Sequence, residues 1–127
     1  MSPLGKPEPI RVVFIDDDPG LCQLVNILLS WEADIELVGV ATTGTQAVEM
    51  VCSLEPDLVI SDIRLPDISG VEVGNRVSEK CPGTRLVLIS GHGAEDLHEE
   101  LKMSVFTYVD KKLAFRDFPA LIRKVMS

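Results

Sequence analysis

The stretch Ile10-Arg11-Val12-Val13-Phe14-Ile15-Asp16-Asp17-Asp18-Pro19 is an apolar run that ends in three consecutive acids. A short apolar run bounded by polar residues is typical of a buried β-strand, so the acids are expected where that strand ends. Asp18 followed by Pro19 predicts a helix start, because aspartate is a favoured N-cap and proline is tolerated in the first helical turn. Carboxylates about 4 Å apart repel by roughly 4 kcal/mol at an effective dielectric of about 20. Asp16 and Asp17 therefore require a compensating charge, and a bound cation is the simplest one.

The size and composition of the chain limit what it can be. Its 127 residues are enough for one domain with a real hydrophobic core. The formal net charge of −8 argues against direct nucleic-acid binding, since phosphate contacts need a basic face. No apolar run approaches the roughly 18 residues of a membrane span, and residues 1–9 lack the apolar core of a secretory signal. We expect a flexible leader over 1–9, one domain over 10–127, and a cytoplasmic location.

The three cysteines, Cys22, Cys52 and Cys81, are far apart in the sequence and odd in number. No C-x-x-C pair occurs, so the spacing indicates neither a zinc site nor a disulfide framework. We expect reduced thiols that fill space in the core.

Apolar runs alternate with helical patterns along the whole chain. Five strands are predicted, over 10–15, 35–40, 57–61, 84–90 and 105–109. Five helices are predicted, over 18–31, from the capping-box sequence 43–46 to residue 54, around 73–77, over 94–101 and over 118–125. In the first helix the spacing predicts an apolar face, formed by Leu21, Leu24, Val25 and Leu28. Continuous apolar strands joined by helices predict a parallel sheet covered on both faces.

Polar residues gather at the predicted carboxyl ends of these strands. The first strand ends in Asp16 and Asp17, the third in Asp62, the fourth in Ser90 and the fifth next to Lys111. Open parallel sheets bind ligands at this edge. Three carboxylates form a hard-oxygen site suited to Mg²⁺, while a hydroxyl and an ammonium group suit phosphoryl oxygens. The set therefore predicts phosphoryl transfer to a carboxylate.

From Ile10 to Met126 the chain resembles the receiver domains of two-component response regulators. The resemblance rests on five motifs in the expected order: Asp16-Asp17, Pro56-Asp57-Leu58-Val59-Ile60-Ser61-Asp62, Leu65-Pro66 with Gly70, Leu88-Ile89-Ser90-Gly91, and Tyr108-Val109-Asp110-Lys111. It implies a flavodoxin-like (βα)5 three-layer sandwich with a five-stranded parallel sheet in the order 2-1-3-4-5.

The resemblance also implies a role for each site residue. Asp62 matches the phosphoacceptor, which takes the phosphoryl group from a sensor histidine kinase or a phosphotransfer protein. Asp17 matches the direct Mg²⁺ ligand, Asp16 the ligand that acts through water, and the backbone carbonyl of Arg64 completes the set. Ser90 and Lys111 match the groups that bind the phosphoryl oxygens. Ser90 and Tyr108 match the switch residues.

Other expectations concern the output. The family's usual output face implies a phosphorylation-dependent homodimer through the fourth helix, the fifth strand and the last helix. Residues 34–42 resemble receivers that are joined to a C-terminal helix-turn-helix DNA-binding domain. Lys112 departs from the family, which commonly has proline there. The protein would catalyse only its own phosphotransfer and autodephosphorylation.

Two alternatives stay open. The D-x-D form of Asp16-Asp17-Asp18 also fits a small phosphatase of the haloacid-dehalogenase type, with Asp16 as nucleophile. Against it, such enzymes usually need a cap domain and a later acidic pair. The other alternative is a degenerate receiver that binds partners without phosphorylation, although all five predicted site residues are present.

Overall fold

Five parallel strands form one sheet in the order β2-β1-β3-β4-β5, in a computed structural model that describes residues 8–91 and 107–127. The strands are β1 (Ile10–Ile15), β2 (Ile35–Ala41), β3 (Leu58–Asp62), β4 (Arg85–Ser90) and β5 (Thr107–Asp110). Both the parallel pairing and the strand order confirm the predicted fold class.

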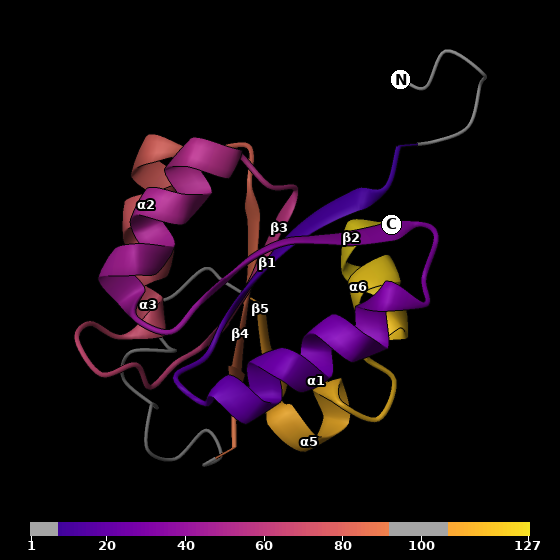
Figure 1. Ribbon diagram of the computed structural model, residues 1–127. Helices are drawn as coiled ribbons and strands as arrows, with labels where there is room; N and C mark the ends of the chain where they lie inside the picture. Colours follow the sequence, from indigo (N-terminus) through magenta and orange to yellow (C-terminus); the bar gives the residue numbers. More distant parts are fainter. Residues whose placement is uncertain (1–7, 92–106) are drawn as a thin grey trace.

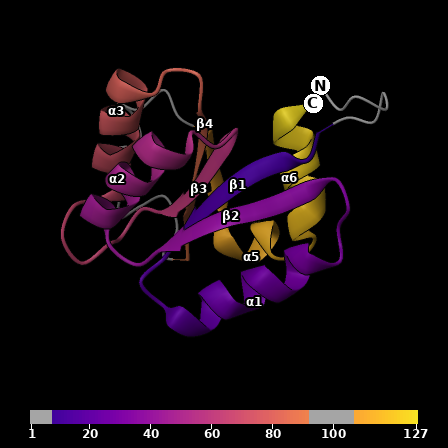
Figure 2. The ribbon, with the colours of Figure 1, turned by 45° about the horizontal axis from the view of Figure 1, so that its top comes forward.

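Helices cover both faces of the sheet (Figures 1 and 2). They are α1 (Pro19–Ser30), α2 (Gly44–Leu54), α3 (Gly70–Lys80), α5 (Lys111–Ala114) and α6 (Phe118–Met126). Val12 and Phe14 of β1 belong to the core under α1 and α6, whereas Val13 and Ile15 belong to the core under α2 and α3. The central strands β1, β3 and β4 are therefore buried on both faces, which explains why they are continuously apolar.

The first helix begins as predicted, and its predicted apolar face packs on the core except at Leu24. Oδ1 of Asp18 accepts a hydrogen bond from the backbone N–H of Gly20 at 2.9 Å, so Asp18 is the N-cap. Val25 is buried as expected, but its buried partners are Cys22 and Leu29. Leu24, predicted on the apolar face, is 42% exposed. Leu21 and Leu28 pack against the same core, so the prediction was wrong only for Leu24. Apolar residues surround much of α1, and its packing on the sheet decides which ones are covered.

The next two helices also start at hydroxyl caps. The Thr43 side chain accepts from the N–H of Gln46 at 3.2 Å, and the Gln46 side chain accepts from the N–H of Thr42 at 3.1 Å. In a standard capping box the Gln46 side chain would accept from the N–H of the N-cap Thr43, but here it accepts from the N–H of the preceding residue, Thr42. Ser69 caps α3 by accepting from the N–H of Glu72.

The C-terminal part differs from the prediction in its short elements. The fifth strand is described from Thr107, and a one-turn helix, α5, follows it without any pattern that predicted it. The predicted helix over 94–101 and the predicted strand start at 105 lie outside the described residues. The peptide bond from Lys111 to Lys112 is trans, as is every described bond. Across 8–91 and 107–127, no helix has the length and apolar content needed to cross a membrane.

Candidate functional site

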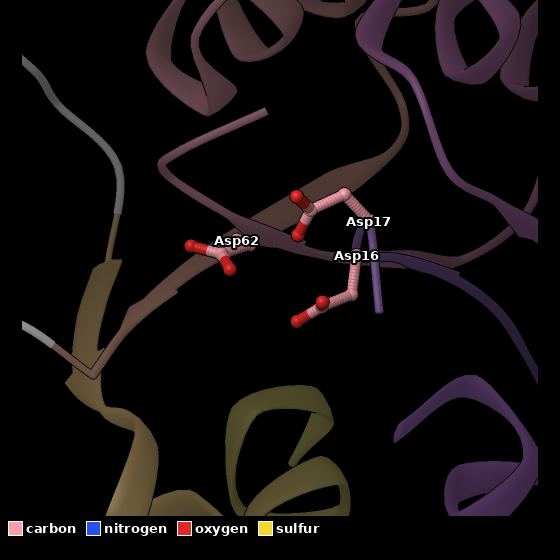
Figure 3. Close-up of side chains that lie close together, drawn as sticks. All are labelled: Asp16, Asp17 and Asp62. Atoms are coloured by element: carbon pink, nitrogen blue, oxygen red, sulfur yellow. The ribbon is translucent and has the colours of Figure 1, made fainter. Parts of the chain in front are cut away.

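Three carboxylates meet at the carboxyl edge of the two central strands. Asp16 and Asp17 follow β1 directly, and Asp62 is the last residue of the neighbouring strand β3. One oxygen from each lies within 4.8 Å of the others, and Figure 3 shows the three side chains close together at these strand ends. The structure thus brings together the acids that the sequence placed at this edge.

The three acids differ in their access to solvent. Asp16 is 1% exposed and Asp62 is 8% exposed, whereas Asp17 is exposed. Oδ1 of Asp16 also accepts a hydrogen bond from the backbone N–H of Asp18 at 2.9 Å. A ligand can therefore reach the cluster past Asp17, with Asp16 forming its buried wall.

Lys111 joins two of the acids. Its Nζ lies 2.7 Å from Oδ2 of Asp16 and 3.1 Å from Oδ2 of Asp62. Oδ2 of Asp16 accepts no well-aligned hydrogen bond within the described residues, so the first contact is an ion pair without hydrogen-bond geometry. Burial alone would lower the pKa of Lys111, but the carboxylates of Asp16 and Asp62 outweigh burial and raise it. Lys111 is therefore a fixed positive charge at neutral pH.

The charge and chemistry of the cluster fit a divalent cation. Three carboxylates against one ammonium group leave two formal negative charges at one edge. All donors are oxygens, which Mg²⁺ prefers, and the buried Oδ2 of Asp16 has an unused acceptor direction. Asp16, Asp17 and Asp62 are thus a group that could bind Mg²⁺.

Ser90 and Tyr108 lie on the next two strands of the sheet. Ser90 is the last residue of β4, fully buried, and pairs in register with Asp110 of β5. Tyr108 packs partly buried against the core under α2 and α3. Its hydroxyl is buried and has no hydrogen-bond partner within the described residues. The phenol oxygen is therefore buried here, and the switch role predicted for Tyr108 remains a prediction.

The loop after Asp62 is held by a residue that the sequence reasoning missed. Asp67 accepts hydrogen bonds from the backbone N–H groups of Gly44 and Thr45 at 2.7 and 2.8 Å, and another from the Thr45 hydroxyl. These bonds, led by the one from the Thr45 hydroxyl, hold the pKa of Asp67 far below its usual range. Asp67 thus caps α2 from a distant loop. No local pattern marks it, because the bonds span 22 and 23 positions.

The same loop closes tightly on the backbone of Asp62. A Cβ atom on Gly70 would lie 2.3 Å from the carbonyl oxygen of Asp62, so a side chain at this position would collide with the backbone. The N–H of Gly70 donates to the carbonyl of Ile63 at 2.7 Å, and the N–H of Arg64 donates to Oδ1 of Asp62 at 3.1 Å. The Arg64 side chain is exposed. The ligand role predicted for its carbonyl remains a prediction.

Comparison with known proteins gives consistent similarities. Residues 12–123 match the family model described as the response regulator receiver domain. The chain is 34% identical over 115 residues to the nitrate/nitrite response regulator protein NarL of Escherichia coli K12, covering 90% of this chain and 53% of NarL. It is 30% identical over 117 residues to the response regulator protein VraR of Staphylococcus saprophyticus, covering 91% and 56%. The response regulator domain of Thermotoga maritima CheB superimposes with a TM-score of 0.77 at 28% identity, covering 94% and 95%. The chain spans about half the length of the curated relatives it matches.

Proposed function

Because the chain belongs to the response regulator receiver domain family of two-component systems, we propose that it is a phosphorylatable switch. Asp62 accepts the phosphoryl group, and the donor is a phosphohistidine on a sensor histidine kinase or a phosphotransfer protein. The observation that supports this is the Asp16, Asp17 and Asp62 cluster with the ammonium group of Lys111 between two of its members.

Asp62 suits the role of nucleophile better than Asp16 does. The Asp62 side chain is 11% exposed, against 1% for the Asp16 side chain. Asp16 is also held by the N–H of Asp18 and by Lys111, below the more exposed Asp17. A phosphohistidine approaching from solvent therefore meets Asp62 before Asp16.

The transfer exchanges one bond to phosphorus for another. An Asp62 carboxylate oxygen attacks phosphorus, the phosphorus–nitrogen bond breaks, and the imidazole of the donor leaves with the bonding electron pair. Asp16, Asp17 and Asp62 would hold Mg²⁺, and the bound ion would supply positive charge against the phosphoryl oxygens. Lys111 keeps its proton because of its raised pKa, and its ammonium group binds the transferred phosphoryl group beside Asp62.

The bound phosphoryl group then biases two states of the domain. It adds about −1.5 to −2 charges at neutral pH, by analogy with phosphoserine. The Ser90 hydroxyl donates a hydrogen bond to a phosphoryl oxygen. The Tyr108 side chain on the adjacent strand β5 then turns inward. Shifting the ratio of the two states from 1:99 to 99:1 needs roughly 5.5 kcal/mol of differential stabilisation. A few charge-assisted hydrogen bonds of about 1.5–3 kcal/mol each supply it.

The output of the switch is a change in binding surface. The surface that includes β5 and α6 forms a homodimer after phosphorylation, or contacts an output domain in a longer protein. The domain catalyses its own phosphotransfer and autodephosphorylation.

Acetyl phosphate with Mg²⁺ tests the proposal, followed by intact-protein mass spectrometry for one added phosphoryl group. Wild type should gain the group and Asp62→Asn should not. Asp57→Asn is the matched control, since Asp57 is an exposed acid just before the same strand, at its opposite end. Equal phosphorylation of wild type and Asp62→Asn would contradict the proposal.

The same experiment separates the alternatives. A phosphatase that uses Asp16 would lose its covalent intermediate in Asp16→Asn and keep it in Asp62→Asn. A degenerate receiver would bind no Mg²⁺ and gain no phosphoryl group in either form.

A further inference from the structure

Two cysteines that are far apart in the sequence have their sulfur atoms in contact. Sγ of Cys81 lies 3.5 Å from Sγ of Cys52, across 29 positions of sequence. Cys52 lies in the last turn of α2, and Cys81 is the C-cap of α3. The two helices run side by side on one face of the sheet in both ribbon views (Figures 1 and 2). The third cysteine, Cys22, is buried on α1 under the opposite face.

We propose that Cys52 and Cys81 are a redox modification site, which a hydroperoxide such as hydrogen peroxide converts into a reversible intramolecular disulfide. This inference does not rest on the proposed phosphotransfer.

The geometry leaves only a short movement to complete. A disulfide bond is about 2.05 Å long, so the sulfur atoms must approach by roughly 1.5 Å. Cys81 can supply that movement because it has left the helical conformation, with φ −137° and ψ 69°. Both residues are half-buried, so a small oxidant can reach the pair from solvent.

The two thiols have different roles. Burial and the contact with Cys52 raise the pKa of Cys81, so its thiol keeps the proton and donates it toward the Cys52 sulfur. The Cys52 sulfur accepts this hydrogen bond, so we assign Cys52 as the attacking group and Cys81 as the thiol that completes the disulfide.

The reaction runs in two steps. The Cys52 sulfur attacks one peroxide oxygen, the oxygen–oxygen bond breaks, and the leaving hydroxide takes the Cys52 proton and departs as water. The Cys81 sulfur then attacks the sulfenic sulfur of Cys52, the sulfur–oxygen bond breaks, and the hydroxyl leaves as water with the Cys81 proton. The thiol pair is oxidised by two electrons, and the peroxide is reduced to two water molecules.

The pair lies away from the carboxylate cluster. Helices that connect parallel strands run opposite to them, so the C-terminal ends of α2 and α3 lie near the amino edge of the sheet. Asp16, Asp17 and Asp62 lie at the carboxyl edge. Substituting either cysteine should therefore leave Mg²⁺ binding unchanged.

Treatment with hydrogen peroxide followed by thiol titration of the unfolded chain tests the proposal. Wild type has three free thiols and should fall to one after oxidation, then return to three after dithiothreitol. A non-reducing digest should contain one cross-linked pair of peptides, which carry Cys52 and Cys81. Three thiols after treatment, or a cross-link that includes Cys22, would overturn the proposal.

Single substitutions sharpen the result. Cys22→Ser should lose both of its remaining thiols on oxidation, whereas Cys52→Ser should form no disulfide within the chain. In Cys81→Ser, dimedone should trap a sulfenic acid on Cys52. A disulfide found only between two chains, in non-reducing electrophoresis at low protein concentration, would also contradict the intramolecular pair.

Discussion

The ammonium nitrogen of Lys111 lies 2.7 Å from Oδ2 of Asp16, an acid that is almost completely buried. Lys111 is the first residue of α5 and directly follows β5, whereas Asp16 directly follows β1. Strands β3 and β4 lie between β1 and β5 in the sheet, so the lysine side chain reaches across the ends of both. Without a bound cation, Lys111 is the positive charge that the described residues place against the acidic cluster. Stability, metal affinity and phosphoryl binding at this edge should therefore all respond to changes at Lys111 or at the acids.

Replacing Lys111 by methionine should destabilise the fold in Mg²⁺-free buffer. The change leaves the buried carboxylate of Asp16 without its partner. Breaking a fully buried pair costs about 3–5 kcal/mol, and the partial exposure of Lys111 reduces the expected loss to about 2 kcal/mol. Urea unfolding measures it. Lys112→Met, at the exposed neighbouring position, should change stability by less than about 0.5 kcal/mol. Equal losses in the two variants would rule out the role of the Asp16 ion pair.

Mg²⁺ should stabilise the folded domain. A ligand that binds only the native state adds about 2.7 kcal/mol at a hundred times its dissociation constant. The midpoint of thermal unfolding should rise with Mg²⁺ and return after addition of EDTA. Asp17→Asn should weaken this response, because it removes the exposed member of the cluster. Asp57→Asn should retain it. An unchanged response in Asp17→Asn would exclude Asp17 as a ligand.

Alkaline pH should remove the contribution of Lys111. Its folded pKa is raised above the unfolded value of about 10.4, so the stabilisation is complete below that value and is lost as pH rises through the folded pKa. The difference in unfolding free energy between wild type and Lys111→Met should therefore shrink above about pH 10. Urea unfolding at a series of pH values measures the difference. A difference that stays constant through this range would contradict the assigned pKa direction.

Gly70→Ala should destabilise the loop that follows Asp62. The added methyl group would lie 2.3 Å from the Asp62 carbonyl oxygen and 3.0 Å from Cα of Ile63, so the backbone must shift. Overpacking of this kind costs roughly 1–3 kcal/mol, and phosphorylation of Asp62 by acetyl phosphate should slow as well. Gly83→Ala is the control, because no atom lies within 4 Å of a Cβ there. Similar stabilities for the two variants would show that the loop adapts to the methyl group.

Asp67→Ala should loosen the contact between this loop and the start of α2. Two backbone N–H groups and the Thr45 hydroxyl lose their acceptor, so the midpoint of urea unfolding should fall. Because its folded pKa is lowered, the Asp67 contribution is present above about pH 4 and is lost as pH falls through the folded value. Glu49→Ala, an exposed change on the same helix, serves as the control. An equal midpoint for Asp67→Ala and Glu49→Ala would contradict the capping role.

Much of the architecture could be predicted because its signals are local. Continuous apolar runs mark strands buried on both faces, and Asp18-Pro19 marks a helix start, so neither requires a distant contact. The position of the acidic cluster also followed from a general rule, because the carboxyl ends of parallel strands share one edge of the sheet. The edge of the α1 face could not be predicted, since Leu24 and Cys22 both fit a helical pattern and the sheet covers only Cys22.

The sequence by itself determined the strands, most of the helices and the edge at which the acids gather. Only the tertiary structure decided which atoms meet: Lys111 with Asp16, Asp67 with the start of α2, Gly70 with the Asp62 carbonyl, and Cys52 with Cys81. The physical reason is the range of the interactions. Periodicity and caps act within a few residues, whereas these contacts depend on strand register and on how two helices pack, which many buried side chains settle together.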